Sequence, residues 1–200
     1  MSTARTTRRP AHDLALIAVF AGVIAALGIV PAVFVPGFPA PLTLQSLGVV
    51  LAGAVLGARR GFLSVLLFLA LVAVGLPLLS GGRGGLGVFT TPYAGFLWAF
   101  PFAALLVGWL TYRRGAPYGV LTGTLINVAG TALLYVGGWL SLVAIGGNTA
   151  VHALALLVIY IPGDLVKMVL AALIARGVHR AAPDLLPPRA QADDVEPVAV

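Results

Sequence analysis

Between Asp13 and Arg176 the chain has almost no charged side chains. The exceptions in this stretch are Arg59, Arg60, Arg83, Arg113, Arg114, Asp164 and Lys167. The whole chain is 60% hydrophobic and 9% charged, whereas about a quarter of the residues of a soluble domain are charged. At roughly 20 residues per membrane crossing, a chain of this length has room for about six helices and little else. The sequence therefore predicts an integral membrane protein without a separate catalytic or nucleotide-binding domain.

Six apolar runs divide the chain, with Pro/Gly clusters or Arg pairs between them. They span about residues 14–30, 42–58, 61–79, 88–112, 116–144 and 151–175. The expected fold is all-α: a polytopic membrane protein with a six-transmembrane-helix bundle over residues 14–175. A basic N-terminus (1–13) precedes it, and a Pro/Ala-rich tail (176–200), expected to be largely disordered, follows it. The fifth run is long and rich in glycine, so it could tilt, break or contain an extra turn.

Basic residues are distributed very unequally between the two sides of these runs. Arg5, Arg8, Arg9, Arg59, Arg60, Arg113, Arg114, Arg176, Arg180 and Arg189 fall on one side, and Arg83 alone falls on the other. Because cytoplasmic loops carry the excess of Lys and Arg, both termini are expected in the cytoplasm, with the loops near 31–41, 80–87 and 145–150 outside. The same placement explains the net charge of +6 better than nucleic-acid binding does.

Residues that commonly carry catalysis or bind metals are sparse. The chain has no Cys, which excludes disulfides and thiolate chemistry. His12, His152 and His179 are scattered, and no two share a helical face with a third ligand. The apolar runs contain neither paired carboxylates nor a Ser/His constellation. We therefore expect no catalytic residues, no metal and no cofactor.

Asp164 and Lys167 interrupt the last apolar run. Three residues separate them, which places both side chains on one face of a helix. Charged groups in a membrane are costly and usually mark a functional site facing a cavity. A structural ion pair that neutralises itself is the alternative. Pro162 and Gly163, just before the pair, predict a kink or break, and a helix that begins there would bring its positive end close to Asp164.

Two further segments offer polar groups on the predicted outer side. Three prolines precede Thr43, Gln45 and Ser46 at the start of the second run, where these side chains could bind a ligand or Thr43 could simply cap the helix. Ser80 begins a glycine-rich stretch that contains Arg83. It lacks the Gly-Lys-Ser/Thr of a P-loop, so it is either a mobile gate with Arg83 available to an anion or a plain flexible connection.

The first run has small residues at four-residue spacing. They are Ala21, Gly22, Ala25 and Ala26. Such a stripe lets another helix approach closely in lipid. Whether that partner belongs to this chain or to another subunit is not decided by the spacing.

Three motifs together resemble the BioY family, the biotin-specific substrate-capture (S) components of energy-coupling-factor (ECF) transporters. They are Pro41-Leu42-Thr43-Leu44-Gln45, the glycine-rich Gly81–Gly87, and Pro162-Gly163-Asp164-Leu165-Val166-Lys167. The resemblance extends over nearly all of residues 14–177. The chain departs from the family pattern GPTGGY, which is replaced by Thr91-Pro92-Tyr93-Ala94-Gly95-Phe96. An aromatic hydroxyl therefore stands at position 93 in place of 96.

The resemblance implies a multi-pass protein of a prokaryotic cell membrane that binds biotin from outside. It implies biotin contacts from Asp164 and Lys167, and the remaining candidate contacts are Arg83, Tyr93, Gln45, Thr43 and Ser80. It also implies that the first helix docks, through its small residues, on a transmembrane coupling subunit driven by two ATPase subunits. The alternatives are an S component for another vitamin, a proton-coupled carrier that works alone or as a homo-oligomer, and a structural membrane protein without a ligand.

Overall fold

The computed structural model describes residues 10–30 and 41–185, and the regular elements of these residues are all helices. The α-helices are α1 (Pro10–Ile29), α2 (Gln45–Leu56), α3 (Ala58–Ala73), α4 (Ala94–Arg114), α5 (Val120–Ala144), α6 (Ala150–Val158) and α7 (Ile161–Ala181). Two short 3-10 helices, η1 (Leu86–Thr90) and η2 (Pro183–Leu185), complete the set. The expected all-α fold is confirmed. Residues 1–9 of the predicted basic N-terminus and residues 186–200 of the predicted disordered tail lie outside the described residues. Residues 10–13 belong to α1, and the first residues of the predicted tail continue α7 to Ala181.

Each of the first five apolar runs contains one α-helix, and the sixth contains two. The break that the sequence allowed in the fifth run does not occur, because α5 is continuous over 25 residues. The sixth run is divided into α6 and α7, which are bent by 56° relative to each other. Among the described helices, α1, α4 and α5 are long and apolar enough to cross a membrane, and the bent α6–α7 pair can count as a fourth crossing. The number of six spans remains a prediction, since α2 and α3 have only 12 and 16 residues.

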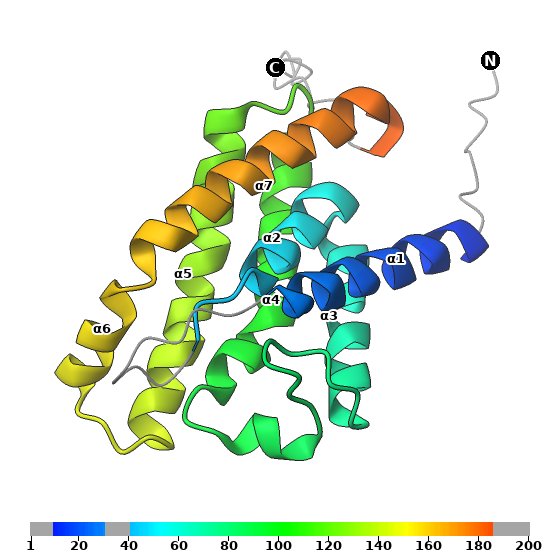
Figure 1. Cartoon of the computed structure of the whole chain (residues 1–200). Coiled ribbons are helices and arrows are strands. Elements are labelled where there is room, and N and C mark those ends of the chain that lie inside the picture. The colour runs from blue at the N-terminus through cyan, green and yellow to red at the C-terminus, as the bar shows by residue number, and fades with distance from the viewer. Residues whose placement is uncertain (1–9, 31–40, 186–200) are drawn as a thin grey trace, which may run out of the picture.

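Helix α4 lies in the middle of the bundle (Figure 1). It packs against α2, α3 and α5, while α7 lies across α2 and α5, and α1 lies across α3. Glycine makes the closest of these approaches possible. A Cβ at Gly95 would meet the backbone of Gly137, and a Cβ at Gly53 would meet the backbone of Ala104. Because α4 touches α5 and α2 backbone to backbone, side chains larger than hydrogen are excluded at these two contacts.

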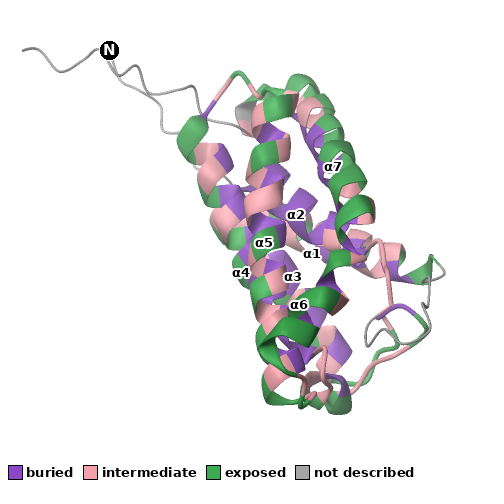
Figure 2. Cartoon of the chain, turned by 90° about the vertical axis from the view of Figure 1, so that its left-hand side faces the viewer, coloured by how far each residue is buried: buried purple, intermediate pink, exposed green. Residues whose placement is uncertain are grey.

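Buried residues face the inside of the bundle, and exposed residues cover its outside (Figure 2). The outside is itself apolar: Leu121, Leu125 and Leu140 are examples of large hydrophobic side chains that are more than half exposed on α5. In water such a surface would be a large apolar patch, whereas in a bilayer it faces hydrocarbon. The structure therefore supports the predicted membrane environment. Polar side chains inside the bundle therefore either form internal hydrogen bonds or serve the function of the protein.

Candidate functional site

A cavity opens among the starts of α2, α4 and α7 and the second half of α5. It encloses about 710 Å³ of empty space, counting the solvent at its open mouth. Its wall is formed by Pro41, Thr43, Gln45, Ser46, Leu79, Arg83, Tyr93, Phe96, Leu97, Phe100, Leu134, Tyr135, Tyr160, Asp164 and Lys167. Six of the seven sequence-predicted ligand contacts line it, and Ser80 does not. Ser80 is fully buried directly behind it.

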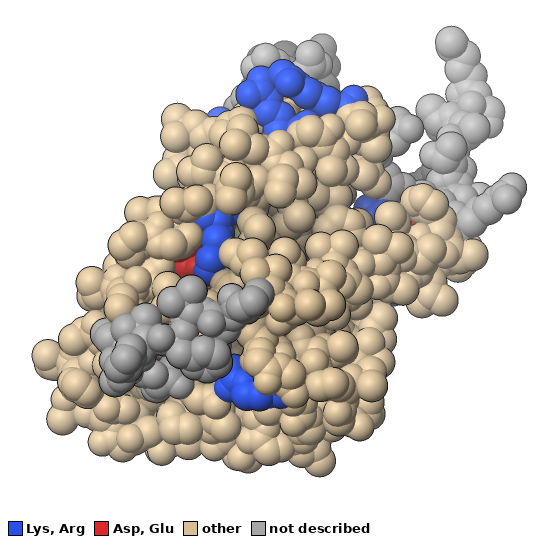
Figure 3. Space-filling view, in the orientation of Figure 1, with Lys and Arg blue, Asp and Glu red and all other residues tan. Residues whose placement is uncertain are grey.

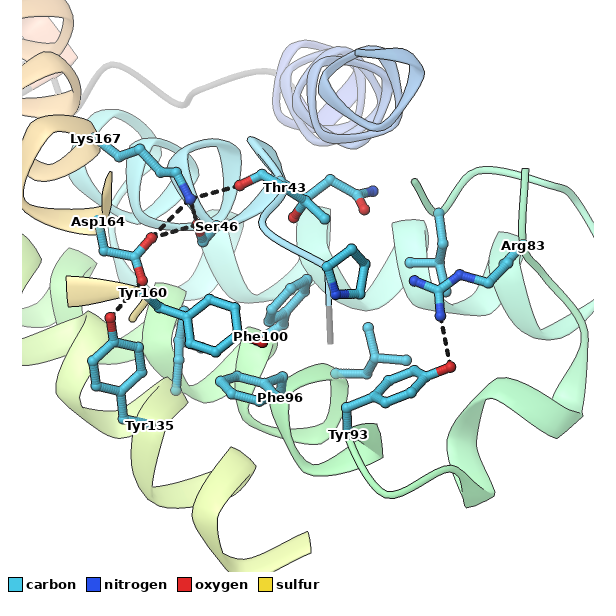
Figure 4. A pocket seen from close by; sticks show the side chains of 15 residues that line it. Thr43, Ser46, Arg83, Tyr93, Phe96, Phe100, Tyr135, Tyr160, Asp164 and Lys167 are labelled. Atoms are coloured by element: carbon cyan, nitrogen blue, oxygen red, sulfur yellow. Dashed lines mark hydrogen bonds and ion pairs between the residues drawn. The ribbon is translucent and has the colours of Figure 1, made fainter. Parts of the chain in front are cut away.

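Asp164 and Lys167 form an ion pair at one end of this cavity (Figure 4), with 2.8 Å between Lys167 Nζ and Asp164 Oδ1. Lys167 Nζ also donates to the carbonyl oxygen of Thr43 at 2.6 Å. The other carboxylate oxygen, Asp164 Oδ2, accepts from the Tyr135 hydroxyl at 2.6 Å. Ser46 Oγ lies 3.5 Å from Asp164 Oδ1 and 3.3 Å from Lys167 Nζ. The pair is thus held by four elements: α2, its entry segment, α5 and α7.

The break between α6 and α7 places this pair. Pro162 lies in the first turn of α7, where its missing N–H costs nothing. The N–H of Asp164 donates to the carbonyl of Tyr160 at 2.9 Å, which starts the hydrogen bonding of the helix. Asp164 consequently lies at the positive end of α7, where a carboxylate is favoured, and Lys167 follows on the same face. The expectation drawn from Pro162 and Gly163 is confirmed.

Arg83 and Tyr93 lie across the cavity from the ion pair (Figure 4). Arg83 Nη1 donates to the Tyr93 hydroxyl at 2.7 Å, and the guanidinium carbon lies 5.1 Å from the centre of the Tyr93 ring. Arg83 Nε also donates to the carbonyl of Ser80 at 3.1 Å. The guanidinium has five N–H groups, so these two bonds leave donors that can bind an anionic group in the cavity.

Gln45 and Thr43 line the cavity and also take part in hydrogen bonds within the protein. The Gln45 side chain is 3% exposed. Its oxygen accepts from the N–H and hydroxyl of Ser80 at 3.2 and 3.4 Å, and its nitrogen donates to Leu78 O at 3.1 Å. Gln45 and Ser80 thereby fasten the glycine-rich loop to the start of α2. Thr43 is not the cap of α2, because Leu44 occupies the N-cap position without a side-chain hydrogen bond. Thr43 instead supplies the carbonyl that Lys167 binds.

Aromatic side chains cover the stretch between the two charged ends. Phe96, Phe100 and Tyr160 lie between the ion pair and Tyr93 (Figure 4), and the Phe96 and Tyr160 rings are 6.4 Å apart between centres. Sequence reasoning missed Phe100, Tyr135 and Tyr160. Tyr135 is the most consequential of the three, because it binds Asp164 directly. The only hint in the sequence is a hydroxyl group in the middle of an apolar run.

The small residues of α1 divide into two groups. Ala21 is buried in the core of the bundle and serves internal packing. Gly22 and Ala26 are exposed, Ala25 is partly exposed, and a Cβ at Gly22 would meet no atom within 4 Å. The exposed part of the stripe is therefore open to a second chain.

The cavity is built for an organic molecule with both polar and apolar parts. Ion-pair groups lie at one end, a guanidinium lies at the other, and aromatic rings lie between them. On an otherwise largely uncharged face, the acidic and basic side chains meet in a hollow (Figure 3). Within residues 10–30 and 41–185, no group of three or more His, Cys, Asp or Glu side chains is close enough to hold a metal ion.

The chain is similar to known proteins over most of its length. It matches the model of the BioY family over residues 1–184. It is 45% identical to the biotin transporter BioY of Rhizobium etli over 185 residues, which are 90% of this chain and 98% of the relative. It is 46% identical to the biotin transporter BioY of Rhodobacter capsulatus over 190 residues, which are 88% of this chain and 97% of the relative.

Among solved structures, the fold is similar to that of the S-component for biotin from an ECF-type ABC transporter. The TM-score is 0.81 and the sequence identity is 29%, and the match covers 88% of this chain and 95% of that one. Sequence and fold agree, and each of the three motifs that resembled the family contributes at least one residue to the same cavity. The chain belongs to the BioY family.

Proposed function

We propose that this protein binds biotin at the outer face of a prokaryotic cell membrane and mediates its uptake as the substrate-specific component of an ECF-type transporter. Relatives that carry the name biotin transporter support the substrate, and the similar S-component supports the type of transporter. The observation that carries the proposal is the cavity itself, in which the Asp164–Lys167 pair faces Arg83 across an aromatic wall.

Biotin has three chemically different parts, and the cavity has a counterpart for each. The ureido ring needs an acceptor for its N–H groups, which Asp164 provides, and a donor for its carbonyl. Lys167 becomes that donor when the ureido carbonyl replaces the weaker of its present acceptors, Ser46 Oγ at 3.3 Å. The thiophane ring and the alkyl chain fit the wall formed by Phe96 and Phe100. The carboxylate needs a cation, and Arg83 keeps donors that its bonds to Ser80 and Tyr93 do not use. Biotin therefore lies with its ureido ring toward α7.

The decisive experiment is a titration of the purified protein with labelled biotin in detergent. Saturable binding that excess unlabelled biotin displaces, and that riboflavin and thiamine do not displace, is the expected result. Displacement by another vitamin in preference to biotin would assign the chain to a different substrate. Absence of saturable binding of any of them would refute a capture component.

The membrane orientation is part of the proposal. The bent α6–α7 pair forms one crossing, which with α1 to α5 makes six, and the Arg59–Arg60 turn lies on the cytoplasmic side with both termini. The chain contains no Cys, so single cysteines can be labelled cleanly. Arg59 and Leu86 are both exposed, so each can be replaced by a cysteine that the label reaches. The two cysteines should react with a membrane-impermeant maleimide from opposite sides, and reaction of both from one side contradicts the six-span orientation.

Partner subunits supply the energy in this proposal. A transmembrane coupling subunit docks on α1 through Gly22 and Ala26, which are exposed, and Ala25, which is partly exposed, and two ATPase subunits drive it. Uptake should then require those subunits and ATP. Uptake by this chain alone that collapses with an uncoupler would instead indicate a proton-coupled carrier.

A further inference from the structure

A second groove, which shares no lining residue with the biotin cavity, lies between the α2–α3 turn and the C-terminal end of α4. Arg59, Arg60, Trp109, Tyr112 and Arg113 line it. The turn consists of Gly57, whose φ is +83° and whose Cβ, if present, would meet the Tyr112 ring at 2.9 Å. Only glycine fits this turn, since other residues rarely adopt this backbone conformation and would contact the ring. The groove is therefore a defined feature of the fold, and the proposed function does not use it.

Arg60 holds the groove together. Its Nε donates to the carbonyl of Leu56 at 3.0 Å, and its Nη1 lies 3.3 Å from Asp13 Oδ1. Its Nη2 donates to the Tyr112 hydroxyl at 3.5 Å, and that hydroxyl donates to Val55 O at 3.1 Å. These bonds neutralise Arg60 and also satisfy the carbonyls of Leu56 and Val55.

Arg59 and Arg113 have no such neutralisation. Among the described residues neither makes an ion pair with a carboxylate, and the groove lining contains no acid. Both side chains are exposed. The Arg113 guanidinium lies 5.0 Å from the centre of the Trp109 ring, which holds it over the groove without cancelling its charge. Two uncompensated guanidinium groups in one groove repel each other and attract an anion with several acceptor oxygens.

An apolar strip leads from this groove along the outer surface of α4. Phe102, Leu105 and Trp109 are 54%, 38% and 48% exposed, and their spacing of three and four residues puts them on one helical face. Phe62 of α3 packs edge-to-face against Phe102, with 5.9 Å between the ring centres. Cationic donors thus lie at the end of a hydrocarbon-facing strip, beside a Trp of the kind found at membrane interfaces. A molecule that matches both features has a phosphate group attached to acyl chains.

We propose that this groove binds the phosphate headgroup of an anionic membrane lipid, in the leaflet on the Arg59 side of the bundle. Arg59 and Arg113 hold the phosphate, and the acyl chains lie along Phe102 and Leu105. A free phosphate ester presents the same headgroup chemistry but does not use the apolar strip. The two sources can therefore be separated by experiment.

The test compares two double variants that each remove two positive charges from the same end of the bundle. Arg59→Gln with Arg113→Gln removes the groove cations. Arg114→Gln with Arg180→Gln is the matched control, because both arginines are exposed and neither lines the groove. Each protein is purified in neutral detergent. Phosphatidylglycerol, phosphatidylcholine or glycerol 3-phosphate is then added, with retained lipid measured by native mass spectrometry and thermal unfolding measured in parallel.

We expect phosphatidylglycerol, but not phosphatidylcholine, to remain bound to the parent protein and raise its melting temperature. The groove variant should bind it roughly ten-fold or more weakly, because each lost charge-assisted hydrogen bond is individually strong, while the control retains it. Without lipid the groove variant should melt close to the parent, since neither arginine makes an ion pair with another described residue and the exposed Arg113–Trp109 contact is weak. If both variants lose the same amount of phosphatidylglycerol, the lipid binds through diffuse surface charge and the proposed site is wrong. Equal stabilisation by glycerol 3-phosphate would overturn the lipid assignment.

Discussion

Replacing both members of the Asp164–Lys167 pair separates ligand binding from structural stabilisation. The side chains of the two residues are only 11% and 12% exposed, and they lie 2.8 Å apart. Asp164→Asn keeps an acceptor for the Tyr135 hydroxyl, which Asp164 Oδ2 accepts at 2.6 Å in the parent. Lys167→Met keeps most of the side-chain volume. It leaves the Thr43 carbonyl without its donor, but that carbonyl borders the open cavity, where water can replace the ammonium group.

The expected magnitudes follow from these contacts. Either single replacement leaves an uncompensated buried charge, which costs roughly 3–5 kcal/mol of stability. The double replacement removes both charges, and exchanging a buried pair for neutral groups is often nearly neutral for stability. Biotin affinity behaves differently, because two charge-assisted hydrogen bonds of about 1.5–3 kcal/mol each are lost. Their sum corresponds to roughly 10²- to 10⁴-fold weaker binding. We expect the lower end of that range, since the pair is already satisfied internally before biotin binds.

The assay is a titration of labelled biotin against each purified variant, with a thermal melt of the same sample. Asp13→Asn with Arg60→Met is the matched control, because it removes the other ion pair of the described residues, whose atoms lie 3.3 Å apart outside the cavity. Its biotin affinity should stay near that of the parent. If the Asp164/Lys167 double variant binds biotin like the parent but melts at a lower temperature, the pair is structural and our assignment of the ureido contacts is wrong.

Three further changes test other parts of the structure. Tyr135→Phe removes the 2.6 Å bond to Asp164 and should weaken biotin binding by roughly ten-fold in the same titration; unchanged affinity would show that this bond does not orient the carboxylate. Gly95→Ala places a Cβ against the Gly137 backbone and should lower the melting temperature by several degrees, whereas Gly22→Ala, which meets no atom within 4 Å, should not. Ala26→Leu should abolish uptake in cells that contain the coupling and ATPase subunits while leaving biotin binding intact. Equal loss of both activities would show that Ala26 supports this chain's own fold.

The sequence predicts the helices well because membrane insertion imposes a simple physical rule. Backbone groups in hydrocarbon must be hydrogen-bonded within the segment, so long apolar runs become helices. The rule does not specify at which residue each helix ends. The run 61–79 ends its helix at Ala73, because Gly75 adopts a φ of +105° and Pro77 cannot donate a helical hydrogen bond. The break before α7 was predictable for a local reason: Pro162 lacks the backbone donor that a continuous helix would need, but it fits the first turn of a new helix.

The site was predicted only in part, because local sequence does not show which side chains meet. Asp164 and Lys167 were found through the cost of charge in a membrane, a property of the residues themselves. Tyr135 was missed because its role depends on how α5 packs against α7, 29 residues away along the chain. Thr43 was found for its side chain, whereas its backbone carbonyl makes the contact with Lys167. Main-chain contacts of this kind are independent of side-chain identity, so no residue pattern indicates them.

Gln45 shows why a polar residue that lines a cavity need not be a ligand contact. A buried amide that already has its hydrogen bonds can bind a ligand only by giving one of them up, and an unmade bond in a buried place costs about 1–3 kcal/mol. Both polar atoms of Gln45 are in use, on Ser80 and Leu78. Arg83 differs, since a guanidinium has five N–H groups and two of them are occupied in these contacts. Spare hydrogen-bonding capacity, and not position in the wall alone, therefore makes Arg83 the stronger candidate for direct contact with biotin, while Gln45 fixes the loop that carries it.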